Sequence, residues 1–427
     1  MAQPLASVLT LGCKLNLADS EELARQLRLA GFRVADSLCE ADAYVINTCS
    51  VTHTADRKSR KLVRSVRRLA PEAKVVVTGC FPQSAGFEVA AALGADFVAG
   101  TRDEDKAGIV DFLALPGASS VAAAEAPPVR LARAFIKAQE GCNDVCAFCI
   151  VPRTRGREVS RPVERVVDEV QQAVDDGARE VVITGTQLGA WGRDFAEPLK
   201  PHHLIDGILE ATDVPRVRFS SLQPQDITPE LLGLWADPRL MPHFHLALQS
   251  GSETTLKAMR RRYTASEFAR AAERIRAAVP NVAITTDVIA GFPGETEDEF
   301  RETLALCEHV GFARIHAFPY SSRSRTTAAL MPGHLPPEVV KERTGRLIEL
   351  GSALWRRFRA GQEGSVRPVL WEAPRAASDG QLLAFGHTDN YVPVYADARN
   401  LEARITQAQL GAVYDDGVRG SVPGEAL

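Results

Sequence analysis

The stretch RAFIKAQEGCNDVCAFC, residues 133–149, joins an apolar run to three cysteines within eight positions. The run predicts a buried β-strand, and the cysteines follow its end with the spacing C-x3-C-x2-C. Soft metals and iron-sulfur clusters select thiolate ligands. Cys142, Cys146 and Cys149 can bind three irons of a four-iron cubane. The fourth iron then keeps a free coordination position, as a catalytic zinc with three protein ligands does.

Two other interpretations of these cysteines are weaker. A structural zinc loop needs a fourth Cys or His, and none occurs within 50 residues after Cys149. A disulfide is disfavoured in the reducing cytosol, where we expect this protein.

The chain around this stretch alternates apolar runs with amphipathic segments, which predicts the fold class α/β. Six strand-then-helix units within residues 133–360 predict a partial (β/α)6 barrel. The cysteine loop follows the first strand. It therefore lies at the carboxyl edge, where such barrels keep their active sites.

Three further segments flank the barrel in a chain of 427 residues, which is too long for one core. Residues 1–116 show the alternation of a parallel α/β domain, and residues 117–132 have the small, proline-containing composition of a linker. Residues 361–427 contain short apolar runs without a helical pattern, which predicts a small antiparallel β domain.

Cys13, Cys49 and Cys80 each stand directly after an apolar run of the first domain. The carboxyl ends of parallel strands meet at one edge, so the three thiols are predicted to meet there and to hold a second cluster, again with a free iron. The alternative is ordinary buried cysteines, since free Cys is among the most buried residue types.

Four motifs resemble those of the radical S-adenosylmethionine (SAM) methylthiotransferases: GCKLN (12–16), NTCSVT (47–52), VTGCFPQ (78–83) and GCNDVCAFCIVPRTRG (141–156). The resemblance covers essentially the whole chain and implies a radical SAM barrel followed by a module similar to TRAM. Lys14 and the segment HTDNYVPV (387–394) most resemble the branch that acts on N6-threonylcarbamoyladenosine 37 of tRNA. Branches acting on isopentenyladenosine 37 or on a ribosomal-protein aspartate remain alternatives, as does a non-catalytic zinc- and RNA-binding protein.

The resemblance implies two [4Fe-4S] clusters and a two-stage reaction. One SAM methylates a sulfur on the cluster of Cys13, Cys49 and Cys80. A second SAM, bound at the cluster of Cys142, Cys146 and Cys149, gives a 5'-deoxyadenosyl radical that removes hydrogen from C2 of the adenine.

The resemblance also implies cosubstrate contacts at the barrel strand ends, for which we select Phe148, Gly185, Gln249 and Gly291. Glycines there allow close approach of backbone to a ligand. For Gly291 the alternative is a glycine that merely completes the turn after a strand.

Residues 57–68 carry seven basic residues and no acid. We predict that Arg57, Lys58, Arg60, Lys61 and Arg64 bind RNA phosphates, although a solvated helix face is a common reason for such a run. Four arginines after the barrel cysteines are predicted either to bind phosphate or to pair with acids such as Glu158 and Asp168: Arg153, Arg155, Arg157 and Arg161.

The implied partners are the anticodon loop of tRNA and an electron donor such as a flavodoxin or ferredoxin. We expect the protein to be a monomer. No apolar run reaches the roughly 18 residues of a membrane span, so we expect a cytoplasmic protein. The last domain has nine acids against five arginines and no lysine, so any RNA contact there must come from a local patch or from stacking, as by Tyr391 or His387.

Overall fold

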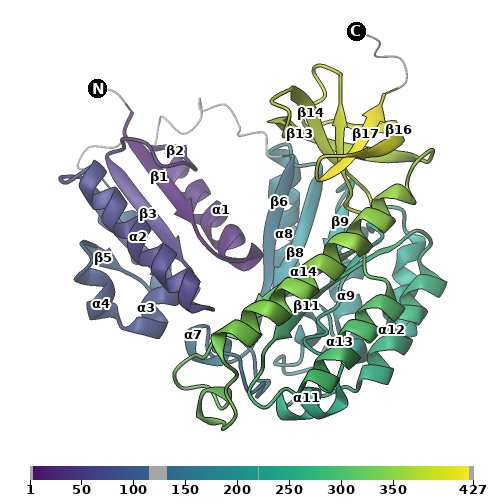
Figure 1. The fold of residues 1–427 in the computed structure, drawn as a ribbon. Coiled ribbons are helices and arrows are strands. Elements are labelled where there is room, and N and C mark those ends of the chain that lie inside the picture. Colours follow the sequence, from purple (N-terminus) through teal and green to yellow (C-terminus); the bar gives the residue numbers. More distant parts are fainter. Residues whose placement is uncertain (1–2, 115–131, 220, 423–427) are drawn as a thin grey trace.

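A computed structural model of the chain describes residues 3–114, 132–219 and 221–422, which form three parts (Figure 1). Nearly all of the predicted linker, 117–132, lies outside the described residues. Among the described residues, no helix is both long enough and apolar enough to cross a membrane.

The N-terminal part is a parallel sheet with strand order β2-β1-β3-β4-β5. Its strands are β1 (Leu5–Thr10), β2 (Arg33–Ala35), β3 (Ala43–Thr48), β4 (Lys74–Gly79) and β5 (Phe97–Val98). Its helices are α1 (Lys14–Leu29), α2 (His53–Leu69), α3 (Cys80–Ala85), α4 (Phe87–Ala91), α5 (Asp103–Lys106) and α6 (Gly108–Leu113). All six residues of β3 are buried, because helices cover both faces of the sheet.

The central part contains the six predicted parallel strands in two curved sheets, of order β7-β6-β8-β9 and β10-β11-β12. Its strands are β6 (Arg133–Glu140), β7 (Val159–Ser160), β8 (Glu180–Gly185), β9 (Val217–Phe219), β10 (His243–His245), β11 (Ala283–Ala290) and β12 (Arg314–Pro319). Its helices are α7 (Val151–Thr154), α8 (Val163–Asp175), α9 (Pro201–Ala211), α10 (Pro229–Gly233), α11 (Glu253–Ala258), α12 (Ala265–Ala278), α13 (Glu297–Val310) and α14 (Pro337–Ala360). The α/β prediction is confirmed, with one addition, the short β7, which pairs antiparallel with β6.

Residues alternate between the two faces of these strands. On one face, Phe244, Ile284 and Val288 belong to the main hydrophobic core. Helices α9, α12 and α13 cover that face, on the side away from the N-terminal part (Figure 1). The opposite, inner face is therefore the one available to a ligand.

The C-terminal part is a closed barrel of strand order β13-β14-β15-β17-β16. Its strands are β13 (Val366–Ala376), β14 (Leu382–Thr388), β15 (Pro393–Ala396), β16 (Ile405–Tyr414) and β17 (Gly417–Ser421). Four of its pairings are antiparallel, as predicted, and the pairing of β15 with β17 is parallel.

This C-terminal part packs on the barrel at the amino ends of the strands, away from the cysteine loop. The guanidinium of Arg218 donates to the carbonyls of Thr388 and Asp389 at 3.0 and 2.8 Å. Arg133 and Arg218 also lie over the ring of Tyr391, at 5.2 and 4.5 Å, and that ring stacks on His387. Both predicted stacking residues thus already have partners inside the molecule.

Candidate active site

The three N-terminal cysteines lie at one edge of the first sheet. Cys49 and Cys80 directly follow the ends of β3 and β4, and Cys13 closely follows the end of β1. These three strands are neighbours in the sheet. Gly12 has φ +120°, and a Cβ there would stand 2.9 Å from the Cβ of Cys49. A glycine is needed because two of the cysteine loops approach each other so closely at this point.

These thiols also interact electrostatically. Burial raises the pKa of Cys49, and burial raises the pKa of Cys80 to about 11. Negative charge on Cys13 and Cys49 would raise the pKa of Cys80 further, while Arg155 acts in the opposite direction. Where burial raises the pKa of a thiol, as for Cys49 and Cys80, a cation beside it favours the thiolate form.

Arg155 is that cation, and it comes from the barrel, just after α7. Its side chain is 3% exposed. One of its terminal nitrogens donates to Asn16 Oδ1 at 2.7 Å and lies 3.2 Å from Asp19 Oδ2, while the other lies 3.2 Å from Glu140 Oε2. Burial alone would lower the pKa of Arg155. Its electrostatic attraction to Cys80 and Cys13 contributes to a pKa above the usual range.

The barrel cysteines occupy the loop between β6 and α7, and polar groups face their sulfurs. The backbone N–H of Asp144 donates to Cys142 Sγ at 3.3 Å, and Arg261 Nη1 donates to Cys146 Sγ at 3.1 Å. Gln187 Oε1 accepts from Cys142 Sγ at 3.2 Å. Burial raises the pKa of Cys142 to about 11 and that of Cys149 to about 12.

The donor chemistry of both groups fits a cubane cluster. All six cysteines are free thiols rather than disulfides. Each group offers three sulfurs with a guanidinium beside them, which suits a cluster with one iron left open to another ligand. The role of the six cysteines as ligands remains a prediction.

The four predicted cosubstrate residues have different surroundings. Phe148 packs against a small hydrophobic core formed by Ala147, Met259, Phe292 and Ala328. Gln249 has φ +67°, and its N–H donates to Asp287 O at 2.8 Å. This left-handed conformation of a non-glycine residue is typical of functional loops.

The two predicted glycines are closely surrounded by protein. A Cβ on Gly185 would lie 2.9 Å from Leu188 Cδ2, and one on Gly291 would lie 2.6 Å from Val340 Cγ2. The N–H of Gly291 donates to Glu295 Oε2 at 2.9 Å. Packing is therefore sufficient to explain the glycine at both positions, and cosubstrate contact stays a prediction.

Sequence reasoning missed Arg261 and Gln187, which approach the barrel cysteines from 115 and 45 residues away. No spacing signal connects Arg261 to the cysteine loop. The predicted acid partners of Arg155 and Arg161 were wrong. Arg155 pairs with Asp19 and Glu140, and Arg161 pairs with Glu22, Asp103 and Glu169, rather than with Glu158 or Asp168.

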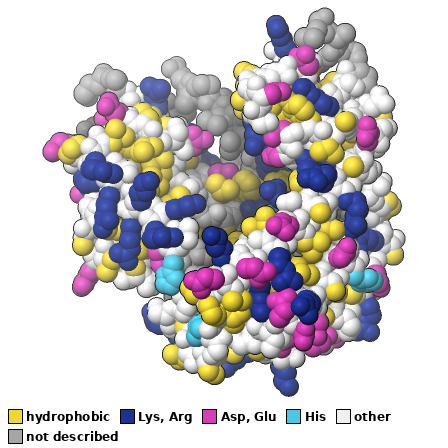
Figure 2. Space-filling view, viewed as in Figure 1, with side chains coloured by type: hydrophobic (Ala, Val, Ile, Leu, Met, Phe, Trp, Pro, Cys, Tyr) yellow, Lys and Arg dark blue, Asp and Glu magenta, His cyan; other side chains and the backbone are white. Residues whose placement is uncertain are grey.

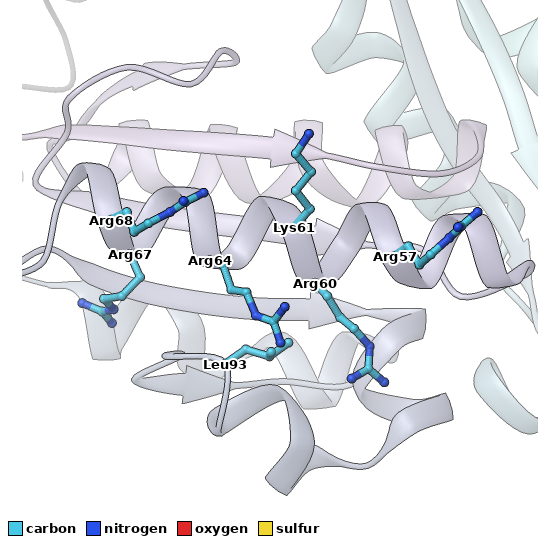
Figure 3. Close-up of a pocket in the computed structure, with 7 residues that line it drawn as sticks. All are labelled: Arg57, Arg60, Lys61, Arg64, Arg67, Arg68 and Leu93. Carbon is cyan, nitrogen blue, oxygen red and sulfur yellow. The ribbon is translucent and has the colours of Figure 1, made fainter.

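The basic run forms most of α2, on the outer surface of the N-terminal part (Figure 2). Its apolar face, with Val63 and Val66, is buried against the sheet. The other face lines a surface pocket of about 630 Å³ (Figure 3), formed by Arg57, Arg60, Lys61, Arg64, Arg67, Arg68 and Leu93. Arg67 is paired with Asp96 at 2.6 Å, and the other cations of this pocket have no ion pair with any described residue.

Solved structures share the fold, and family models match two parts of the chain. The radical SAM methyltransferase TsrM from Kitasatospora setae, with tryptophan substrate and a SAM analog bound, has a TM-score of 0.53 and 15% identity. The match covers 74% of this chain and 73% of that chain. Residues 136–307 match the radical SAM superfamily, and residues 6–100 match a family described as Uncharacterized protein family UPF0004. The fold is that of radical SAM enzymes, which use SAM and a [4Fe-4S] cluster.

Relatives of known name define the family more narrowly. Threonylcarbamoyladenosine tRNA methylthiotransferase MtaB of Bacillus subtilis is 36% identical over 96% of this chain and 94% of its own length. The protein of the same name from Thermotoga maritima is 37% identical over 85% of each chain. The tRNA-2-methylthio-N(6)-dimethylallyladenosine synthase of Syntrophotalea carbinolica is 33% identical over 95% of this chain and 96% of its own. The chain belongs to the radical SAM tRNA methylthiotransferases.

Proposed function

We propose that the protein adds a methylthio group to C2 of N6-threonylcarbamoyladenosine 37 in tRNA. The observation that carries the proposal is the position of Arg155, which connects the barrel cysteine loop to the N-terminal cysteines. This residue leaves the barrel cysteine loop and acts on Cys80 and Cys13 of the other domain. A methylthio transfer needs a radical source and a sulfur source close together, and two such groups at one domain junction supply that arrangement.

In this proposal, Cys142, Cys146 and Cys149 hold one [4Fe-4S] cluster, and Cys13, Cys49 and Cys80 hold a second. With SAM bound, the clusters would supply the radical and the sulfur. The protein's own residues neutralise and position the sulfurs. Arg261 and the N–H of Asp144 donate to the barrel thiolates, and Arg155 offsets the charge of the N-terminal thiolates.

The nucleoside is proposed from the sequence motifs and from relatives. The two relatives named for threonylcarbamoyladenosine have 36% and 37% identity, and that named for dimethylallyladenosine has 33%. Isopentenyladenosine is the second candidate, supported by that third relative. Membership in the enzyme family removes the non-catalytic zinc protein from consideration.

Helix α2 is proposed to hold the tRNA backbone. Arg57, Lys58, Lys61 and Arg64 are exposed, and none has an ion pair with a described residue. Unpaired cations along one helix attract phosphate and carry no sequence preference.

Nucleoside analysis tests this function. We expect tRNA from a strain lacking the gene to lose 2-methylthio-N6-threonylcarbamoyladenosine and to accumulate its unmethylthiolated precursor. An unchanged level of that nucleoside would contradict the proposal. Loss of the dimethylallyl derivative instead would establish the second candidate.

A further inference from the structure

The inner face of the central barrel is polar. Phe244, Ile284 and Val288 pack into the main core, so their neighbours His245, Thr285 and Asp287 point to the other side. His245 pairs in register with Thr285, and Asp287 pairs with His316. A barrel interior that only packs would be filled with apolar side chains, so ionisable groups here indicate a binding surface.

Three of these side chains converge. His245 Nε2 lies 3.3 Å from Asp287 Oδ2, and one polar atom each of His245, Asp287 and His316 lie within 4.8 Å of one another. His245 Nδ1 is 3.0 Å from Thr285 Oγ1. Burial lowers the pKa of His316, so its ring is neutral near pH 7 and can donate or accept one hydrogen bond.

Lys14 is the first residue of α1, the helix of the N-terminal part that packs against β6 and β8. Its ammonium group interacts electrostatically with Glu180 of β8 and Asp287 of β11, and with Arg133 and Arg218. Within the described part of the chain, Lys14 has no hydrogen bond or ion pair, which leaves its three N–H groups free for a ligand.

The floor of this space carries further positive charge. Glu180 is shared by Arg133, Arg216 and Arg218, at 2.5, 3.5 and 2.8 Å. Two histidines and a carboxylate are also a known metal-ligand set. Here, however, the ammonium group and the guanidinium groups repel a cation and attract an anion.

We propose that Lys14, together with His245, Asp287 and His316, binds the carboxylate-bearing substituent on N6 of the target adenosine. The inference rests on the proposed function and identifies the residues that read the substrate. The threonylcarbamoyl group has a carboxylate for Lys14, and a hydroxyl and N–H groups for Asp287 and the histidines. A dimethylallyl group offers none of these partners and would leave the charge of Lys14 without one.

A matched pair of RNA ligands tests the site directly. The holoenzyme is titrated with an anticodon stem-loop RNA that carries either N6-threonylcarbamoyladenosine or its methyl ester, which keeps the shape and removes the charge. We expect the wild type to bind the acid about 10- to 100-fold more tightly than the ester, as for removal of a charged hydrogen bond. Equal affinities in the wild type would overturn the proposal without any variant.

Variants then locate the effect. Lys14→Met should bind both RNAs about equally at matched iron content, while Lys14→Arg should keep a preference for the acid. Unchanged discrimination by Lys14→Met, or stoichiometric zinc that is lost in His316→Ala, would overturn the assignment. If the wild type methylthiolates only an isopentenyladenosine RNA, the proposed function itself has failed.

Discussion

Arg155 is the residue that links the two cysteine groups. It follows the barrel cysteine loop in sequence, yet its guanidinium pairs with Asp19 of α1 and acts on the thiols of Cys80 and Cys13. Because it is buried with its acid partners, it is fixed in place before any cluster binds. We interpret it as a positioning residue for the N-terminal site.

Arg155→Met should reduce the iron held by the N-terminal site and lower the free energy of unfolding by about 3 kcal/mol, because Glu140 and Asp19 lose a buried partner. Iron is measured in a background with Cys142, Cys146 and Cys149 changed to alanine, so that only the N-terminal site contributes. Arg155→Lys, which keeps the charge, should restore part of the iron. Full iron content and an unchanged melting temperature in Arg155→Met would contradict this role.

At the scale of elements, helix α1 joins the N-terminal part to the edge of the barrel. Its Glu21 accepts a hydrogen bond from the N–H of Phe135 in β6 at 2.8 Å. Burial raises the pKa of Glu21 from 4.5 to about 7. The folded state therefore binds more protons than the unfolded state between these two values, and its stability falls as pH rises through this window.

Glu21→Gln should remove this pH dependence, because glutamine keeps the acceptor oxygen and does not ionise. Relative to the wild type, we expect the variant to gain about 2 kcal/mol of unfolding free energy between pH 5 and pH 8. Denaturant titration at both pH values measures the difference. A constant difference between the two proteins would show that Glu21 is not held in its protonated form.

Helix α2 makes a separate prediction about RNA. Changing Arg57, Lys61 and Arg64 together to glutamine should weaken tRNA binding. The slope of log K against log salt concentration should become shallower by about 0.9 for each phosphate that the helix no longer neutralises. Stability should not change, since these side chains are exposed. Arg270→Gln with Arg274→Gln, on exposed positions of α12, is the matched control. Equal salt slopes for the two variants would contradict a role for α2.

These elements also show what the sequence could predict. The strand ends that carry Cys13, Cys49 and Cys80 were predictable, because a buried parallel strand is a continuous apolar run and its carboxyl end fixes where the next residue lies. The pairs Arg261–Cys146 and Arg155–Asp19 were not, because 115 and 136 residues separate their members. The parallel pairing of β15 and β17 was also unpredictable, since it depends on closure of the small barrel.

At the scale of the molecule, the chain places three kinds of site around one junction. Arg155 connects the barrel cysteine loop to the N-terminal cysteines, and Lys14, directly next to Cys13 in sequence, interacts with charges of the polar barrel interior. The cationic face of α2 lies outside on the same N-terminal part (Figure 2). A tRNA held by its backbone could present one unstacked base to the interior.

In the proposed reaction, one cysteine group supplies the radical and the other supplies the sulfur. The most direct test measures 5'-deoxyadenosine and methylthio product in the same reaction for Cys146→Ala and Cys49→Ala, with wild type reconstituted to about eight irons as the reference. We expect neither product from Cys146→Ala, and 5'-deoxyadenosine without methylthiolation from Cys49→Ala. Methylthiolated tRNA from Cys49→Ala would contradict this expectation.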